Sequence, residues 1–319
     1  MMEIPYESSL LIASSLPTIT PSLKDGRTEV PHLCSLENPS WTAEQQAALF
    51  HVHRVRVAAC YLALIANGIL LLFQIKIKLF LRTYFVFGLS LTTADLTFSV
   101  CSFLKTQLWA LPCRWPDSLL FNAVNTAGHF HAYVSVLLIT VDRYLALVWD
   151  PLRYKGIASL KRYYVIFALS WCFSFLYSFV IRYFFPPGSY ESSLEACILP
   201  SIVMVTCTFM YIKIYLATPL LPAAPGQENC RYKQSRKLLF AIMLILVASF
   251  VTSIPMSVFH FNVFLGRIRF ADFENILMAN IFYTLQIAIA VFNPIIYWWQ
   301  VLLREIQPIC GCWETKISR

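Results

Sequence analysis

Charged residues are scarce in this chain: only 13% of its 319 residues are Asp, Glu, Lys or Arg, while 58% are hydrophobic. A soluble domain carries about 25% charged and about 45–50% apolar residues. The shortage of charge therefore excludes an ordinary soluble domain and indicates a protein that crosses a membrane several times. Glycine is also scarce, with nine residues, and no repeat of fixed period occurs, which argues against a repeat architecture.

Metal and catalytic patterns are missing as well. Ten cysteines are scattered through apolar segments without the spacing of metal ligands, which excludes a zinc fold and a disulfide-dense scaffold. No pairing of a nucleophile with a base is visible, so we expect no enzymatic activity, no cofactor and no bound metal. The net charge of +8 lies near the ends of apolar segments, and we expect no nucleic-acid partner.

Seven apolar spans are present, and each has about the 20 residues that a hydrocarbon core of about 30 Å requires. They cover approximately residues 55–80, 83–104, 118–141, 163–185, 197–217, 238–262 and 273–299. We therefore predict an all-α fold, a seven-transmembrane helix bundle at residues 55–300. An N-terminal segment, 1–54, precedes it. Residues 301–319 are predicted to form a short amphipathic helix and a tail.

The basic residues predict the orientation in the membrane, because cytoplasmic loops carry an excess of Lys and Arg. Nine lie on one side, in or next to the N-terminal segment and the loops after the second, fourth and sixth spans, at Lys24, Arg27, Arg54, Arg56, Lys105, Arg114, Arg182, Arg267 and Arg269. Fifteen lie on the other side, at Lys76, Lys78, Arg82, Arg153, Lys155, Lys161, Arg162, Lys213, Arg231, Lys233, Arg236, Lys237, Arg304, Lys316 and Arg319. We expect the N-terminus outside the cell and the C-terminus in the cytosol, as an odd number of spans requires.

The most informative stretch is the uncharged run from Leu119 to Val141, which is followed at once by Asp142-Arg143-Tyr144. Charged groups at the mouth of a spanning helix mark function more often than packing. Most of the other spans carry one marker each. These are Asn67 in the first span, Asp95 in the second, Trp171 in the fourth, Pro255 in the sixth and Asn293-Pro294-Ile295-Ile296-Tyr297 at the end of the seventh.

With these markers in this order, residues 55–310 resemble the class A, rhodopsin-like G protein-coupled receptor family. The resemblance implies a plasma-membrane receptor that passes the signal of an extracellular ligand to a heterotrimeric G protein. It also implies that Arg143, held by Asp142, is released when a cleft opens for that partner. The residues that it assigns to coupling and switching are Asp142, Arg143, Tyr144, Tyr211, Asn293, Pro294 and Tyr297.

The resemblance places a polar core at Asn67 and Asp95. An acid inside a span costs about 2.5–3.5 kcal/mol on insertion scales, so Asp95 must be paired, hydrated or neutral. Asn67 and Asn293 are candidate partners for it across the helices. Ala132, Ile289 and Ala290 offer no side-chain oxygen nearby, and we therefore expect Asp95 to bind sodium poorly.

The chain departs from the family pattern in the sixth span. Ser253 stands two residues before Pro255, where the family usually has tryptophan, so the rotation of an indole cannot be the trigger. No acid lies near Ser235 at the base of the same span, so a tether from that helix to Arg143 is missing. We therefore expect appreciable basal signalling.

The outer halves of the spans predict a ligand pocket lined by Asn125, His129, Arg182, His260, Tyr283 and Gln286. Asn125 stands where aminergic receptors carry an acid, which argues against a biogenic amine. Arg182, Arg267 and Arg269 can attract an anionic lipid, a nucleotide or an acidic peptide; scattered loop charge is the alternative. His129 and His131 lie two residues apart and face different sides of a helix, so we interpret them as packing residues, not a metal pair.

Other readings of the sequence stay open. A non-signalling or decoy receptor-like protein is one alternative, because of Ser253, and a chemosensory, odorant-like receptor is another. A transporter would show internal symmetry, which is not visible. Cys310 and Cys312 are candidate acylation sites, and free cytosolic thiols are the alternative.

The family resemblance further implies an extracellular disulfide between Cys113 and Cys197, with Cys34 as the alternative partner. Mutation of Cys113 or of Cys197 to Ser should abolish surface expression, because an unpaired outer loop would not mature in the oxidising compartment. Flow cytometry of an N-terminally tagged chain measures this. Normal trafficking of both variants would show that the thiols are free.

Overall fold

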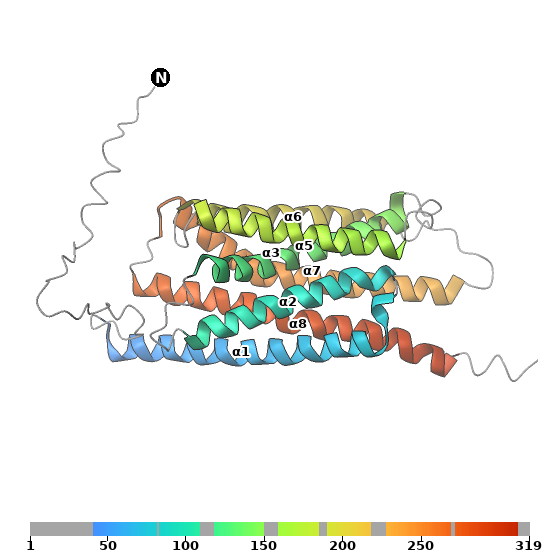
Figure 1. Cartoon of the computed structure of the whole chain (residues 1–319), viewed down its shortest axis with the longest axis horizontal. Helices are drawn as coiled ribbons and strands as arrows, with labels where there is room; N and C mark the ends of the chain where they lie inside the picture. The colour runs from blue at the N-terminus through green and yellow to red at the C-terminus, as the bar shows by residue number, and fades with distance from the viewer. Residues whose placement is uncertain are drawn as a thin grey trace, which may run out of the picture. The chain divides into compact units, whose positions relative to one another are not determined.

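The computed structural model describes residues 41–81, 83–108, 118–149, 159–184, 190–217, 228–268 and 272–311. In these ranges the chain forms seven long α-helices and no β-strand (Figure 1). They are α1 (Ala43–Lys76), α2 (Thr83–Leu108), α3 (Leu119–Tyr144), α5 (Leu160–Phe184), α6 (Tyr190–Ala217), α7 (Glu228–Phe264) and α8 (Phe273–Gly311), with short turns η2 (Leu79–Leu81) and η4 (Leu145–Trp149). All seven contain a segment long and apolar enough to cross a membrane, which confirms the predicted seven-span helical fold.

The first helix begins earlier than the apolar run predicts. The Thr42 hydroxyl accepts a hydrogen bond from the backbone N–H of Gln45, and the Gln45 side chain accepts one from the N–H of Thr42. This reciprocal pair satisfies two of the donors that a helix N-terminus leaves open. The helix therefore starts at Ala43, well before the apolar span predicted from about residue 55.

The last helix is longer than predicted at its other end. α8 runs without a break to Gly311, so the separate short helix expected after the seventh span is not present. No glycine occurs between Phe273 and Gly311 to terminate the helix in a left-handed turn. The seventh span and the segment that follows it are one continuous element.

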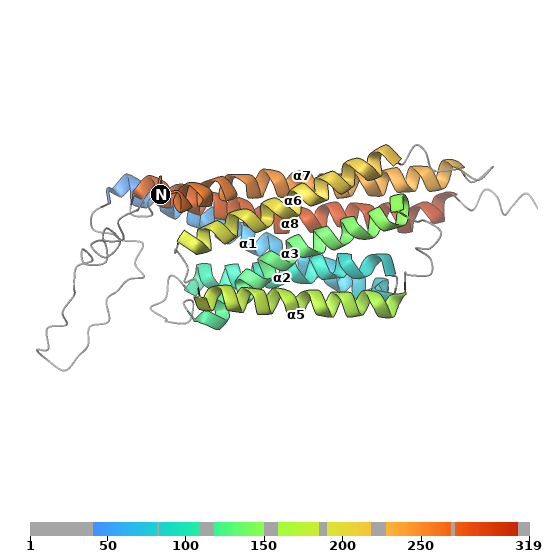
Figure 2. The same ribbon diagram turned by 90° about the horizontal axis from the view of Figure 1, so that it is seen from above.

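The helices pack side by side, and α3 lies against three of them. α1 contacts α2 and α8; α3 contacts α2, α5 and α6; and α7 contacts α6 and α8. α1 begins at the end of the bundle opposite to the one where α8 ends (Figure 1). Figure 2 shows α5 along one edge, and its Leu169, Phe173 and Leu176 are exposed, as lipid-facing residues should be.

His131 ties three helices together inside the bundle. It is fully buried, and its ring nitrogens are hydrogen-bonded to Ser90 at 2.8 Å and to Ser174 at 2.9 Å. The ring also stacks on Trp171, with centroids 4.1 Å apart. Because α2, α3 and α5 each supply one part, this residue is confirmed as a packing histidine.

α2 and α3 approach closely at Gly128. A Cβ atom there would lie 2.9 Å from the backbone nitrogen of Phe98 and 3.2 Å from Cγ2 of Thr97. In contrast, a Cβ atom on Gly68 of α1 would meet no atom within 4 Å. The two glycines thus form a matched pair, one required by packing and one not.

Gly128→Ala should lower the free energy of unfolding by about 1–3 kcal/mol, because the backbone of α2 must move to admit a methyl group. Gly68→Ala should leave it unchanged or raise it by up to about 1 kcal/mol, because alanine favours the helix. Thermal unfolding of the purified protein in detergent micelles measures both. Equal midpoints for the two variants would contradict the close approach.

Candidate functional site

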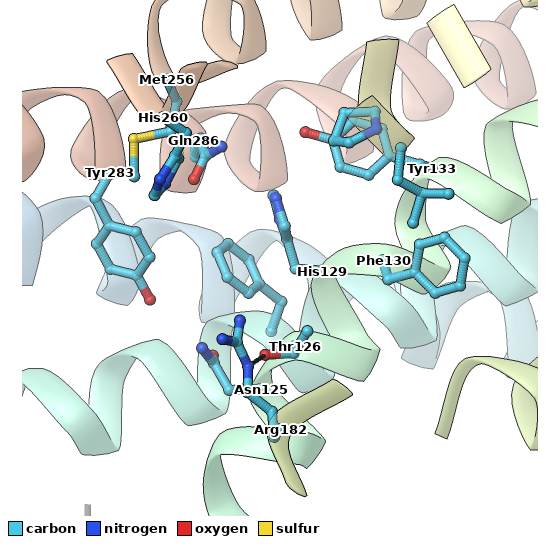
Figure 3. Close-up of a pocket in the computed structure, with 13 residues that line it drawn as sticks. Asn125, Thr126, His129, Phe130, Tyr133, Arg182, Met256, His260, Tyr283 and Gln286 are labelled. Atoms are coloured by element: carbon cyan, nitrogen blue, oxygen red, sulfur yellow. Dashed lines mark hydrogen bonds between the residues drawn. The ribbon is translucent and has the colours of Figure 1, made fainter. Parts of the chain in front are cut away.

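A cavity of about 150 Å³ opens among α2, α3, α5, α6, α7 and α8. All six residues predicted to form a ligand pocket line it (Figure 3). Phe98, Phe130, Tyr133, Pro200 and Met256 add apolar wall, and Thr126 adds a hydroxyl. Because α3 and α8 contribute through their first halves, and α5 and α7 through their ends, the cavity lies near the end of the bundle where α1 begins.

Arg182 reaches the cavity from the last turn of α5. Its Nε donates a hydrogen bond of 2.9 Å to the hydroxyl of Thr126 on α3, and Figure 3 shows the guanidinium beside Asn125. The anchor to Thr126 fixes the orientation of a long, flexible side chain. The cationic group is therefore part of the cavity wall.

A second arginine lies behind the opposite wall. Arg56 of α1 is only 7% exposed and donates a 2.8 Å hydrogen bond to Oδ1 of Asn280. Its guanidinium carbon is 6.0 Å from the ring centroid of Tyr283, whose hydroxyl is hydrogen-bonded to Ser102 at 3.0 Å. The sequence places Arg56 among the nine basic residues of the outer side. In the structure it lies inside α1 and is buried against α8, which the sequence did not predict.

Tyr133 forms the floor of the cavity, and its hydroxyl is bonded to a serine behind it. Tyr133 of α3 is hydrogen-bonded to Ser253 of α7 at 2.7 Å, and both residues are buried. The ring of Tyr133 also meets His129 edge to face, with centroids 5.0 Å apart. Ser253 thus occupies the position of the family's tryptophan and bonds to a neighbouring helix instead of filling space.

Tyr133 also belongs to the main apolar cluster of the bundle. The same cluster contains Tyr211 of α6 and Ile245 of α7, and Tyr144 at the end of α3 packs against it. Side-chain contacts are therefore continuous from the cavity floor to the residue next to Arg143. No property of the sequence alone identified Tyr133 as the link.

The polar core joins α8 to α1 and α2. Asn293 donates a 3.0 Å hydrogen bond to Oδ2 of Asp95, as its position suggested. Asn67 does not reach Asp95; its amide donates to the backbone carbonyl oxygens of Ala290 at 2.7 Å and Ala63 at 2.9 Å. The side-chain oxygens of Asn67 and Asn293 are buried without a partner among the described residues, so this region has acceptors for bound water.

The charged pair lies at the opposite end of α3. Arg143 and Asp142 form an ion pair of 3.3 Å, with Asp142 buried. The hydroxyl of Tyr163 on α5 donates a hydrogen bond to the other oxygen of Asp142. Sequence reasoning missed Tyr163, because nothing in its local pattern shows which helix it faces.

Several predicted site residues cannot be placed in full. Tyr297 and Cys310 fall in α8, but their side chains lie outside the described residues, as do Cys113 and Cys312 altogether. Cys197, which the resemblance places in the second outer loop, lies inside α6, because the helix already begins at Tyr190, and it has no disulfide partner among the described residues. Its bridge to Cys113 stays a prediction.

Comparison with known proteins agrees with this arrangement. The model of the seven-transmembrane receptors of the rhodopsin family matches residues 66–197, which include the charged pair at the end of α3. Over these residues, which are less than half of the chain, the chain is similar to that family. With seven helices long and apolar enough to cross a membrane, it has the architecture of a multi-pass membrane protein, and the general partners of that family are ligands and G proteins. A comparison with curated proteins gives no match.

The Tyr133–Ser253 contact can be tested in this protein by a double-mutant cycle. Tyr133→Phe and Ser253→Ala should each lower the free energy of unfolding, and the double variant should fall short of their sum by about 0.6–1.7 kcal/mol. Thr206→Val is the control: its hydroxyl is exposed and donates only within α6, so it should add to Tyr133→Phe without coupling. Additive effects of Tyr133→Phe and Ser253→Ala would contradict the bond.

Proposed function

We propose that this receptor binds an extracellular ligand in the cavity around His129 and activates a heterotrimeric G protein through Arg143. It acts in the plasma membrane with the N-terminus outside. The observation that supports the proposal most directly is the position of Tyr133. This residue lines the cavity and also belongs to the apolar cluster against which Tyr144 packs.

In this proposal a ligand acts on α3 and α7 at the cavity floor. Movement of His129 or of Ser253 displaces the Tyr133 hydroxyl, and the apolar cluster transmits the displacement towards Tyr211. A close-packed cluster has discrete arrangements and does not deform continuously, so a small shift at one end changes the packing at the other. The ligand stabilises one of these arrangements.

At the cytosolic end, the change acts on the Asp142–Arg143 pair. Tyr163 holds Asp142 from α5, so the acid stays in place when the guanidinium turns away from it. Arg143 can then contact a G protein. The residues assigned to this step are Asp142, Arg143, Tyr144, Tyr211, Asn293, Pro294 and Tyr297. Lys155, Lys161 and Arg236 would complement an acidic partner surface or anionic lipid headgroups.

A second candidate is a receptor-like protein that binds a ligand but does not signal. The specific observation behind it is Ser253, which leaves the sixth span without the bulky side chain that the family usually has there. The two functions differ in one measurable property, the dependence of a G protein response on Arg143.

The test is a G protein activation panel in cells that express equal surface amounts of each variant. The wild-type chain should give a basal signal and Arg143→Ala should abolish it. Asp142→Asn should raise it about two- to fivefold, the equivalent of losing a half-buried ion pair worth about 0.5–1 kcal/mol. Arg162→Ala is the control, because this exposed arginine lies at the same end of the bundle. A wild-type chain that is silent with every G protein, or a basal signal that survives in Arg143→Ala, would favour the non-signalling protein.

A further inference from the structure

The polar groups of the cavity wall are either cationic or neutral. Its polar lining comprises one guanidinium from Arg182, two imidazoles from His129 and His260, two carboxamides and three hydroxyl groups. Among the described residues that line the cavity, none is Asp or Glu. A cationic wall in a low-dielectric bundle favours an anionic guest, because a buried charge is stabilised by an opposite charge placed against it.

The position of Arg182 suits an oxyanion. Its Nε is engaged with Thr126, which holds the planar guanidinium in one orientation at the wall (Figure 3). A fixed, planar guanidinium is the side chain that best matches the two oxygens of a carboxylate. Arg56 adds a second positive charge behind Tyr283, so the field across the cavity is positive from both sides.

One polar atom of the wall is short of a partner. Nδ1 of His260 is buried and makes no hydrogen bond with any residue in the described part of the chain. Gln286, which is 8% exposed, also turns a polar side chain to the cavity. Unsatisfied polar groups are rare in protein interiors, so the one on His260 indicates that a guest or water completes it.

The rest of the wall limits the body of the guest. Phe98, Phe130, Tyr133 and Met256 form apolar sides, and the cavity of about 150 Å³ is small for a ligand site. An apolar cavity of about 150 Å³ in another protein admits a benzene ring. The space therefore suits a single ring or a short aliphatic chain, and it has no room for a long acyl chain.

We propose that the cavity binds a small organic carboxylate, with its oxygens on Arg182 and a ring-sized apolar body between Phe98, Phe130 and Met256. This inference rests on the proposed function of the cavity as the ligand site. It goes further by selecting Arg182 from the three outer arginines that the sequence left equivalent. Arg267 is exposed on the connection after α7, and Arg269 lies outside the described residues.

The experiment uses the full chain in phosphatidylcholine nanodiscs and a matched pair of probes, 3-phenylpropionate and 3-phenylpropionamide. A thiol-reactive dye follows thermal unfolding, because Cys60, Cys101 and Cys207 are buried free thiols in the folded protein. The acid should raise the midpoint by about 3 °C or more at saturation. The amide should bind about ten- to a hundredfold more weakly.

Two variants assign the binding to the guanidinium. Arg182→Gln should weaken binding of the acid about ten- to a hundredfold and leave the amide unaffected. Arg267→Gln removes an exposed outer arginine and should bind both probes as the wild type does. If Arg182→Gln does not fold, Arg182→Lys is used instead. Lysine keeps the positive charge but lacks the planar guanidinium, so this variant should weaken the binding of the acid and not that of the amide.

The outcomes separate this inference from the proposed function. Equal affinity for acid and amide, no binding of the acid, or undiminished acid binding in Arg182→Gln would each overturn the carboxylate proposal and leave G protein coupling untouched. If oleate in the nanodisc raised the unfolding midpoint and 3-phenylpropionate did not, the proposal that the ligand has a small apolar body would be overturned. Binding of the acid by a chain that shows no Arg143-dependent signal would support the carboxylate site and contradict the receptor function.

Discussion

Polar side chains inside the bundle can find partners only in other helices, because hydrocarbon supplies none, and this constraint determines how the helices are held together. The amide of Asn67 donates a hydrogen bond to the backbone carbonyl oxygen of Ala290, which fixes α1 against α8. Asp95 accepts a hydrogen bond from Asn293, which fixes α2 against the same helix, while His131 connects α2, α3 and α5. Each contact is worth about 0.6 kcal/mol on average, so together they specify orientation more than they add stability.

α3 is the element in which these constraints meet. Its residues alternate between two tasks: His131 turns towards α2 and α5, and His129, two positions earlier, turns towards the cavity. Tyr133 is again on the cavity side and Asp142 is held by α5 at the far end. One helix thus carries both the cavity floor and the charged pair, and a rotation of that helix would change both together.

Much of this architecture could be read from the sequence, because span length and the order of markers are local properties. The six cavity residues could be chosen because each lies in the same half of its span. Partner choice could not be predicted, since it depends on how each helix is rotated: the bonds of Tyr163 to Asp142 and of Tyr133 to Ser253 leave no trace in spacing. The burial of Arg56 could not be predicted for the same reason, because it depends on contacts with Asn280 and Tyr283 of α8.

The early start of α1 did have a local signal. Thr42 followed three residues later by Gln45 is a capping pattern, and it stands well before the apolar run that marked the span. The continuation of α8 to Gly311 was equally readable from the absence of glycine. The predicted boundaries followed hydrophobicity, which indicates the depth of a residue in the membrane and not the residue at which a helix begins or ends.

The hydroxyl pair of Tyr133 and Ser253 has a mechanical consequence. A large ring at the base of a cavity can turn only if its neighbours make room, so its barrier is steric. A serine hydroxyl swings about one bond, and a single water molecule can insert between it and the phenol and replace the lost contact. The hydrogen bond between α3 and α7 can therefore be exchanged for a water-mediated contact without the rotation of a large ring.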